Sequence, residues 1–148
     1  MAAAWLDVNP VLLTAVTAAL SAQVLKFLLY AWYRRRARLE RLLGAGGMPS
    51  SHSAMVAALV TGIGRRYGPH SSAFAVATVF GLIVLYDAIG VRRAVGLQAR
   101  YLNRLQRALS VHPVRMGEEP QDFPEYIGHT PVEVLIGTLW GVAWAIWG

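Results

Sequence analysis

Two histidines in this 148-residue chain lie in settings that suit the transfer of a phosphoryl group. A neutral imidazole can attack phosphorus through one nitrogen while the other donates to a carboxylate that fixes the tautomer. His129 and Glu133 are four residues apart at a predicted helix start, on one face, and can supply that pair. His52 is the histidine available to protonate the leaving oxygen. The spacing predicts a nucleophile, an orienting carboxylate and a general acid.

Three cations occur close to the same motifs, and they suit the charge that phosphoryl transfer develops. Lys26, Arg92 and Arg93 are expected to hold the phosphate oxygens, whose charge must be neutralised in the transition state. Ser51 lies at a predicted helix start, where backbone N–H groups add donors for phosphate. Asp87 is expected to support the site by pairing with one of these cations. No metal ion and no cofactor are predicted.

Each candidate also has a purely structural interpretation. Thr130, Pro131 and Glu133 fit a capping box, which would use the carboxylate to start a helix. Serines before an apolar run are typical helix caps, Lys26 can snorkel to a membrane surface, and adjacent arginines can anchor a helix end. Gly137 and Gly141 form a pair of small residues that is typical of close helix packing.

Composition places the chain in a membrane. It is 55% hydrophobic and only 15% charged, whereas soluble proteins have about 25% charged residues. The net charge of +6 comes from arginines between long apolar runs. This argues against a soluble nucleic-acid binder, and no nucleic-acid partner is predicted. Because there is no cysteine, a disulfide framework and a thiolate metal site are excluded.

The apolar runs predict an all-α integral membrane protein with a single domain over residues 1–148. Its expected elements are four transmembrane helices and an amphipathic helix on the membrane surface. Three tryptophans near the end of the fourth span are typical of an interfacial belt, and an ordered loop or lid is expected over 112–128. The spans are about 11–33, 51–64, 71–90 and 131–147, and the amphipathic helix is about 95–109.

Arginines are distributed unequally between the two predicted membrane faces. The positive-inside rule therefore makes the arginine-rich face cytoplasmic and leaves both termini outside, in what is expected to be a prokaryotic cytoplasmic membrane. The opposite face has two arginines, Arg65 and Arg66. The arginine-rich face has eleven: Arg34, Arg35, Arg36, Arg38, Arg41, Arg92, Arg93, Arg100, Arg104, Arg107 and Arg115.

Three motifs resemble those of the type 2 phosphatidic acid phosphatases, relatives of the vanadium-dependent haloperoxidases. Pro49-Ser50-Ser51-His52 is similar to that family's Pro-Ser-Gly-His, and His129 with Glu133 is similar to its closing His-x-x-x-Asp. With Tyr86-Asp87-Ala88 and Gly90-Val91-Arg92-Arg93, the strings resemble the family's divergent bacterial and plant branch more closely. The resemblance runs from about Gln23 to Gly141.

The resemblance implies a metal-independent hydrolase of a membrane lipid or polyprenyl phosphate or diphosphate. By motif match His129 is the nucleophile, Glu133 its orienting carboxylate and His52 the general acid, while Lys26 takes the place of the first-motif lysine. That first motif reads Lys-x6-Arg-Pro in the family, and this chain has no arginine at the matching distance after Lys26. The third-motif Ser-Arg is also missing, and Arg92 and Arg93 are our substitutes for it.

Two other functions stay open. A lipid-phosphate binder or transporter would keep the phosphate pocket without hydrolysing its ligand. A small structural subunit is the third possibility, and it does not explain why the two histidines are predicted on the same face. Four short spans also allow a homodimer.

Overall fold

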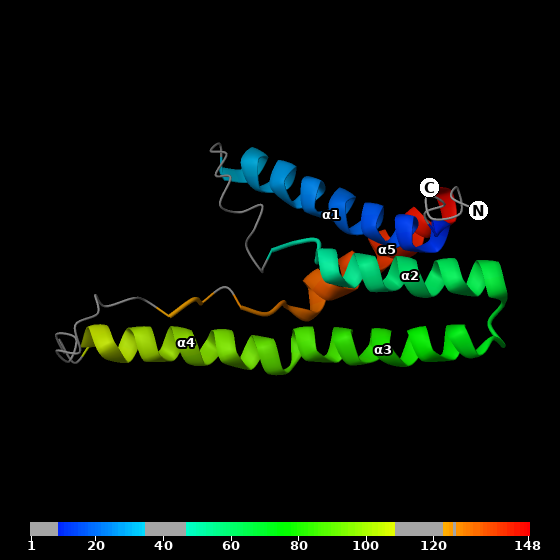
Figure 1. Cartoon of the computed structure of the whole chain (residues 1–148). Helices are drawn as coiled ribbons and strands as arrows, with labels where there is room; N and C mark the ends of the chain where they lie inside the picture. Colours follow the sequence, from blue (N-terminus) through cyan, green and yellow to red (C-terminus); the bar gives the residue numbers. More distant parts are fainter. Residues whose placement is uncertain (1–8, 35–46, 109–122, 126) are drawn as a thin grey trace, which may run out of the picture.

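The computed structural model describes residues 9–34, 47–108, 123–125 and 127–148, which form five helices and no strand. The predicted all-helical fold class is confirmed. Figure 1 shows the five helices, labelled α1 to α5 in chain order. They are α1 Pro10–Arg34, α2 Ser51–Tyr67, α3 Ser72–Ile89, α4 Val91–Ala108 and α5 Pro131–Trp147.

Serine and threonine begin the helices that carry the site. The side chain of Ser50 accepts a hydrogen bond from the Ser53 backbone N–H at the start of α2, and Thr130 does the same for Glu133 at the start of α5. These bonds satisfy N–H groups that have no partner inside a helix. At its other end α2 stops at Gly68, whose φ of 82° is costly for other residues.

Small residues let α2 and α5 approach closely. A Cβ atom added to Gly141 would lie 2.8 Å from the carbonyl carbon of Ala54, and one added to Gly137 would lie 3.0 Å from the backbone nitrogen of Ser50. Both distances are shorter than ordinary van der Waals contacts, so only glycine allows this separation. The predicted packing role of the two glycines agrees with this geometry. Helix α2 also contacts α1 and α3 and is the central element of the bundle.

Two indoles join α5 to α1. Trp140 Nε1 donates to Ser21 Oγ at 2.9 Å, and Trp144 Nε1 donates to Thr17 Oγ1 at 3.1 Å. Both indoles lie half-buried between helices, and the interfacial belt expected of the tryptophans stays a prediction. The exposed Trp147, at the end of α5, is the one that remains available to an interface.

Large apolar side chains cover the outside of α1 and α3. Residues 10–33 and the α3–α4 helix pair are long and apolar enough to cross a membrane. The apolar α5 and the more polar α2 have 17 residues each, which is roughly 25 Å and less than a bilayer core of about 30 Å. Exposed side chains on the outer faces include Leu12, Leu20, Val24 and Leu28 of α1 and Val79, Phe80, Leu82 and Ile83 of α3.

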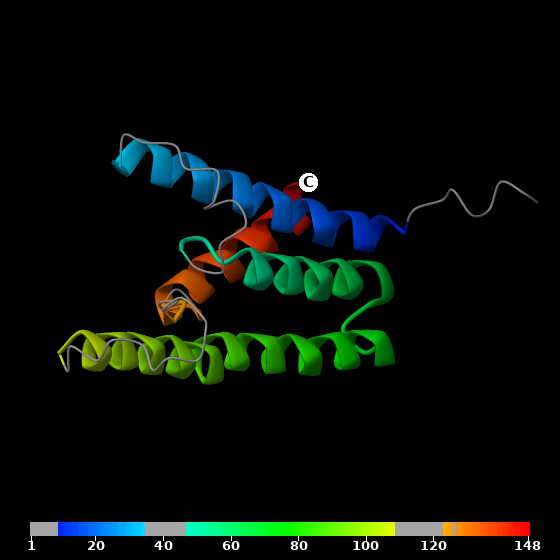
Figure 2. The ribbon, with the colours of Figure 1, turned by 60° about the vertical axis from the view of Figure 1, so that its left-hand side comes forward.

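Helix α4 follows α3 after one residue and continues in nearly the same direction (Figures 1 and 2). Helical hydrogen bonds pass through this junction, because Gly90 donates to the Tyr86 carbonyl and accepts from the Ala94 N–H. The amphipathic helix therefore begins at Val91, four residues before its predicted start. Its amphipathic pattern is present, and its position along the membrane surface stays a prediction.

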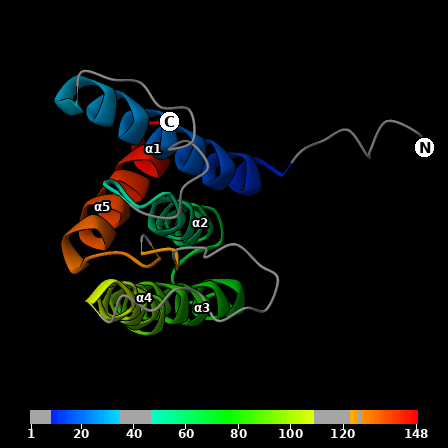
Figure 3. The same ribbon diagram turned by 90° about the vertical axis from the view of Figure 1, so that its left-hand side faces the viewer.

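The ends of four helices gather at one end of the bundle. The C-terminal ends of α1 and α3 and the N-terminal ends of α2 and α5 lie on the same side in Figures 1 and 2, and Figure 3 views the bundle from that side. This is the arrangement that the alternating spans predicted. Arg35, Arg36, Arg38, Arg41, Arg115 and most of the predicted loop over 112–128 lie outside the described residues.

Candidate active site

The two histidines meet where α2 and α5 begin. His52 is the second residue of α2, His129 stands immediately before the N-cap of α5, and their ring centroids are 6.3 Å apart at an interplanar angle of 78°. His129 is buried and His52 is exposed. Backbone bonds fix the junction: Ser50 N–H donates to the Glu133 carbonyl, and His129 N–H donates to the Ala88 carbonyl, both at 3.1 Å. Three helices therefore position the pair.

Glu133 is held by the helix start rather than by His129. Its Oε2 accepts from the Thr130 backbone N–H at 3.0 Å, and its own N–H donates to Thr130 Oγ1 at 3.3 Å. This is the capping box that the sequence offered as the structural alternative. Among the described residues, no hydrogen bond joins His129 to Glu133, and the buried Nε2 of His129 has no hydrogen-bond partner.

Burial lowers the pKa of the His129 imidazole below its ordinary value. The carboxylate of Glu133 opposes this shift, while Lys26, His52 and Arg92 add to it. A low-dielectric setting disfavours the charged form. His129 is therefore neutral at neutral pH, as a nucleophilic imidazole must be.

The predicted cations Lys26 and Arg92 lie beside the histidines. Lys26 is buried, and a Cβ added to Gly47 would lie 3.4 Å from its Cδ, so the chain before α2 packs against the lysine stem. Arg92 Nε lies 2.5 Å from Asp87 Oδ2, which is the kind of pairing expected for Asp87. Both cations are close enough for their charges to act on His52 and His129.

A cavity of about 240 Å³ opens next to His129. Arg93, Thr130 and Glu133 also line it, so one predicted phosphate-binding arginine lines the same cavity as the predicted nucleophile. Of the other predicted site residues, Lys26, Ser51, His52, Asp87 and Arg92 are not among the described lining residues. No group of three histidine, aspartate or glutamate side chains suited to a metal ion occurs in the part of the chain that the structure describes.

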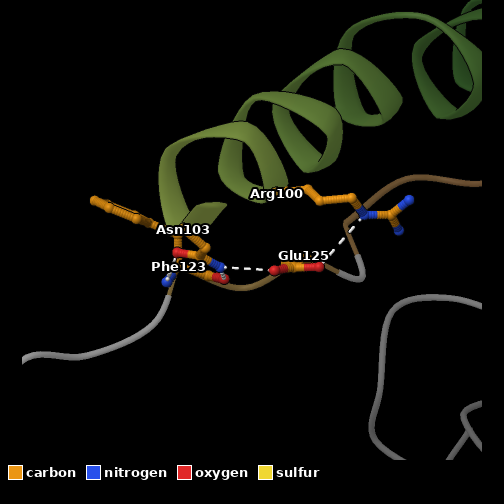
Figure 4. A network of polar contacts seen from close by, with 4 residues as sticks. All are labelled: Arg100, Asn103, Phe123 and Glu125. Carbon is orange, nitrogen blue, oxygen red and sulfur yellow. Dashed lines mark hydrogen bonds and ion pairs between the residues drawn. The ribbon is translucent and has the colours of Figure 1, made fainter. Parts of the chain in front are cut away.

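Sequence reasoning missed a polar network on α4, which Figure 4 shows. Asn103 is 1% exposed. Its Nδ2 donates to the Phe123 carbonyl and to Glu125 Oε1, both at 2.9 Å, and its Oδ1 accepts from the Phe123 N–H at 3.0 Å. Arg100 Nε lies 3.3 Å from Glu125 Oε2, and both of these residues line the cavity.

A signal for this network was present in the sequence. Gly96, Ala99 and Asn103 are spaced by three and four residues, so they share one face of α4. Two small residues followed by an amide indicate a face against which a backbone segment packs. All three residues are buried.

Comparison with known proteins places the chain in a family. The family described as "Divergent PAP2 family" matches residues 8–144, a range that includes every candidate site residue. The chain belongs to the divergent PAP2 family. A curated relative, the uncharacterized membrane protein YuiD of Bacillus subtilis (strain 168), is 38% identical over 143 residues and covers 88% of each chain. No solved structure matches the chain.

Membership supports two of the expectations above. The predicted divergent branch is confirmed, and a membrane relative together with two candidate spans supports a membrane protein. Family membership is compatible with a phosphatase-like hydrolase.

Proposed function

We propose that the protein hydrolyses the phosphate of a membrane lipid or polyprenyl phosphate or diphosphate through a phosphohistidine on His129. One observation carries the proposal: a buried, neutral histidine lines a cavity with Arg93 and lies 6.3 Å, centroid to centroid, from a second histidine. Ionisable residues brought together among apolar helices are costly, which favours a functional role. The family match supports the same chemistry.

The reaction has two steps. A ring nitrogen of His129 attacks phosphorus, the bond from phosphorus to the leaving oxygen breaks, and protonated His52 gives its proton to that oxygen. Water then attacks the phosphohistidine, His52 takes a proton from it, and phosphate leaves. Arg92, Arg93 and Lys26 neutralise charge on the phosphate oxygens, with backbone N–H groups near Ser51 as additional donors.

Glu133 influences the nucleophile through its charge in the described geometry. Its carboxylate opposes the lowering of the His129 pKa and would stabilise the positive charge that develops on the ring during attack. Asp87 supports the site by orienting Arg92.

A phosphatase assay with point variants tests the proposal. Detergent-purified protein is incubated with a panel of lipid and polyprenyl phosphates, and released phosphate is measured. We expect His129→Ala and His52→Ala to abolish release, while His70→Ala, which removes an exposed histidine between α2 and α3, leaves it unchanged. Release that survives in His129→Ala would refute the phosphohistidine.

A specific observation favours a second candidate, lipid-phosphate binding without hydrolysis. Glu133 is engaged in the capping box, and no described hydrogen bond orients His129 through it. This candidate predicts saturable binding of a lipid phosphate with no phosphate release from any member of the panel, and loss of binding in Arg93→Ala.

The orientation in the membrane belongs to the same proposal. We place the site at the cytoplasmic face, with both termini outside, on the arginine distribution. Because the chain has no cysteine, Arg38→Cys gives a single labelling site. A membrane-impermeant thiol reagent should leave it unlabelled in intact cells and label it after lysis. Labelling in intact cells would reverse the orientation.

A further inference from the structure

We infer that Asn103 is the positioning residue that sets where His129 stands, by anchoring the segment that leads to it; this inference rests on the proposed function. We call this segment, residues 123–125 and 127–130, the strap. It runs beside α4 toward the start of α5, in the direction opposite to α4 (Figure 1). It ends on His129, so its anchors determine the place of the nucleophile.

The amide of Asn103 fits the strap backbone as a peptide group would. It donates to the carbonyl of Phe123 and accepts from the N–H of the same residue, at 2.9 and 3.0 Å, and its second hydrogen goes to Glu125 at 2.9 Å. All of its donors are used, and the side chain is buried. No other residue type of this size offers two donors and an acceptor in one plane.

Backbone packing then guides the strap along α4 and α3. A Cβ on Gly96 would lie 3.2 Å from the Glu125 carbonyl oxygen and closer still to that of Ile127. A Cβ on Gly128 would collide with the backbone of Arg93. The last anchor is the bond from His129 N–H to the Ala88 carbonyl at 3.1 Å.

The strap is short between its first and last anchors. Six peptide steps join Phe123 to His129, while Asn103 and Ala88, which hold the two ends, are fifteen residues apart on nearly collinear helices, roughly 22 Å at the helical rise. Because so few residues separate the two anchors, we expect a displacement at Asn103 to reach His129.

Four variants test this inference. Asn103→Leu keeps the size of the side chain and removes all three bonds, and Gly96→Ala pushes the strap away from α4 while keeping Asn103. Gln98→Ala is the matched control, because it removes an exposed amide from α4 on a different face. In His70→Ala, which lacks an exposed histidine far from the strap, the modification of His129 relative to His52 should match that of the unaltered protein.

Two readouts separate the anchor from the chemistry. The first is amide hydrogen exchange of residues 123–130 together with the rate at which diethyl pyrocarbonate modifies His129 relative to His52. We expect both to rise at least tenfold in Asn103→Leu and Gly96→Ala and to stay unchanged in Gln98→Ala. The second is phosphate release, in which kcat should fall at least tenfold in the same two variants while KM changes less than threefold.

The outcomes are distinct. Unchanged exchange and modification in Asn103→Leu would overturn the anchor. A loosened strap with wild-type kcat would overturn the positioning role and leave the proposed function standing. If the unaltered protein releases no phosphate while the strap loosens, the anchor is right and the proposed hydrolysis is wrong.

Discussion

Replacing Gly141 by alanine tests whether the close contact between α2 and α5 holds the histidines together. The added Cβ would lie 2.8 Å from both the carbonyl carbon and the Cα of Ala54, whereas ordinary contacts begin at 3.4 Å. The two helices must therefore separate by at least 0.6 Å at this level, because the obstacle is backbone and cannot rotate away. Ala54 is two residues from His52, so the separation reaches the site.

The cost follows from two opposing effects. Overpacking against a rigid neighbour costs about 1–3 kcal/mol, and we take the upper end because backbone must move. Alanine is a better helix former than glycine by about 1 kcal/mol, so the net loss is about 2 kcal/mol. Since a 1 Å misplacement can cost about a hundredfold in rate, a 0.6 Å shift of His52 should lower phosphate release about tenfold.

Gly62→Ala is the matched control. Its Cβ would lie 3.1 Å from Val11 Cγ1, which belongs to a side chain that can adjust by a few tenths of an ångström. This variant keeps the propensity gain and should be as stable as the unaltered protein or slightly more so. Unfolding in a mixed-micelle SDS titration measures both variants. Equal unfolding free energies for Gly141→Ala and Gly62→Ala would refute the rigid-contact reasoning.

Three further predictions concern the other end of the bundle, the α1–α5 contact and the nucleophile. Arg65 donates to the carbonyls of Ala145 and Ile146, and charge-assisted hydrogen bonds contribute about 1.5–3 kcal/mol. Arg65→Ala should therefore lower the melting temperature, whereas Arg66→Ala should leave it unchanged. A double-mutant cycle of Trp144→Phe and Thr17→Ala should give a coupling of about 0.6 kcal/mol, as is typical of hydrogen bonds between membrane helices, and strict additivity would show that the bond contributes nothing. Burial lowers the pKa of His129, and its neutral form is the proposed nucleophile. Phosphate release should therefore be lost with falling pH only below the ordinary value of 6.5, and a midpoint above 6.5 would contradict the buried setting.

The helices were predictable because their signals are local. Long apolar runs separated by Ser, Gly and Pro fix where a helix can start and stop, and α5 occupies the predicted residues 131–147. The meeting of His52 and His129 was predictable for a related reason. When successive helices alternate in direction, two helix starts separated by one helix pair return to the same end of the bundle.

Contacts between a helix and a non-helical segment distant in sequence were not predictable. Asn103 binds residues 20 and 22 positions away, and only the folded chain brings the strap to α4. Helix α3 ends at Ile89 and α4 begins at Val91, and the backbone of Gly90 between them is not helical, with φ −97° and ψ −94°. Its N–H and carbonyl still bond to Tyr86 and Ala94 in the helical pattern, which keeps the two helices nearly in line. The role of Glu133 depended on a choice between two adjacent partners, and the local capping box is the one that forms.

The arginines of this chain have different structural roles, which depend on the residues around them. Arg65 ties the end of α2 to the end of α5, and Arg92 is paired with Asp87. Arg93 and Arg100 line the cavity together with Glu125 and Glu133, so with His129 neutral the described lining carries no net charge. Because Arg92 is balanced by Asp87, an excess of positive charge at the proposed nucleophile must then come from Lys26 beside the cavity. The net charge of +6 consequently does not measure attraction for phosphate. Because Arg100 already has a carboxylate partner, an anion that enters the cavity meets its least compensated charge on the side of Arg93 and His129, where the proposed transfer takes place.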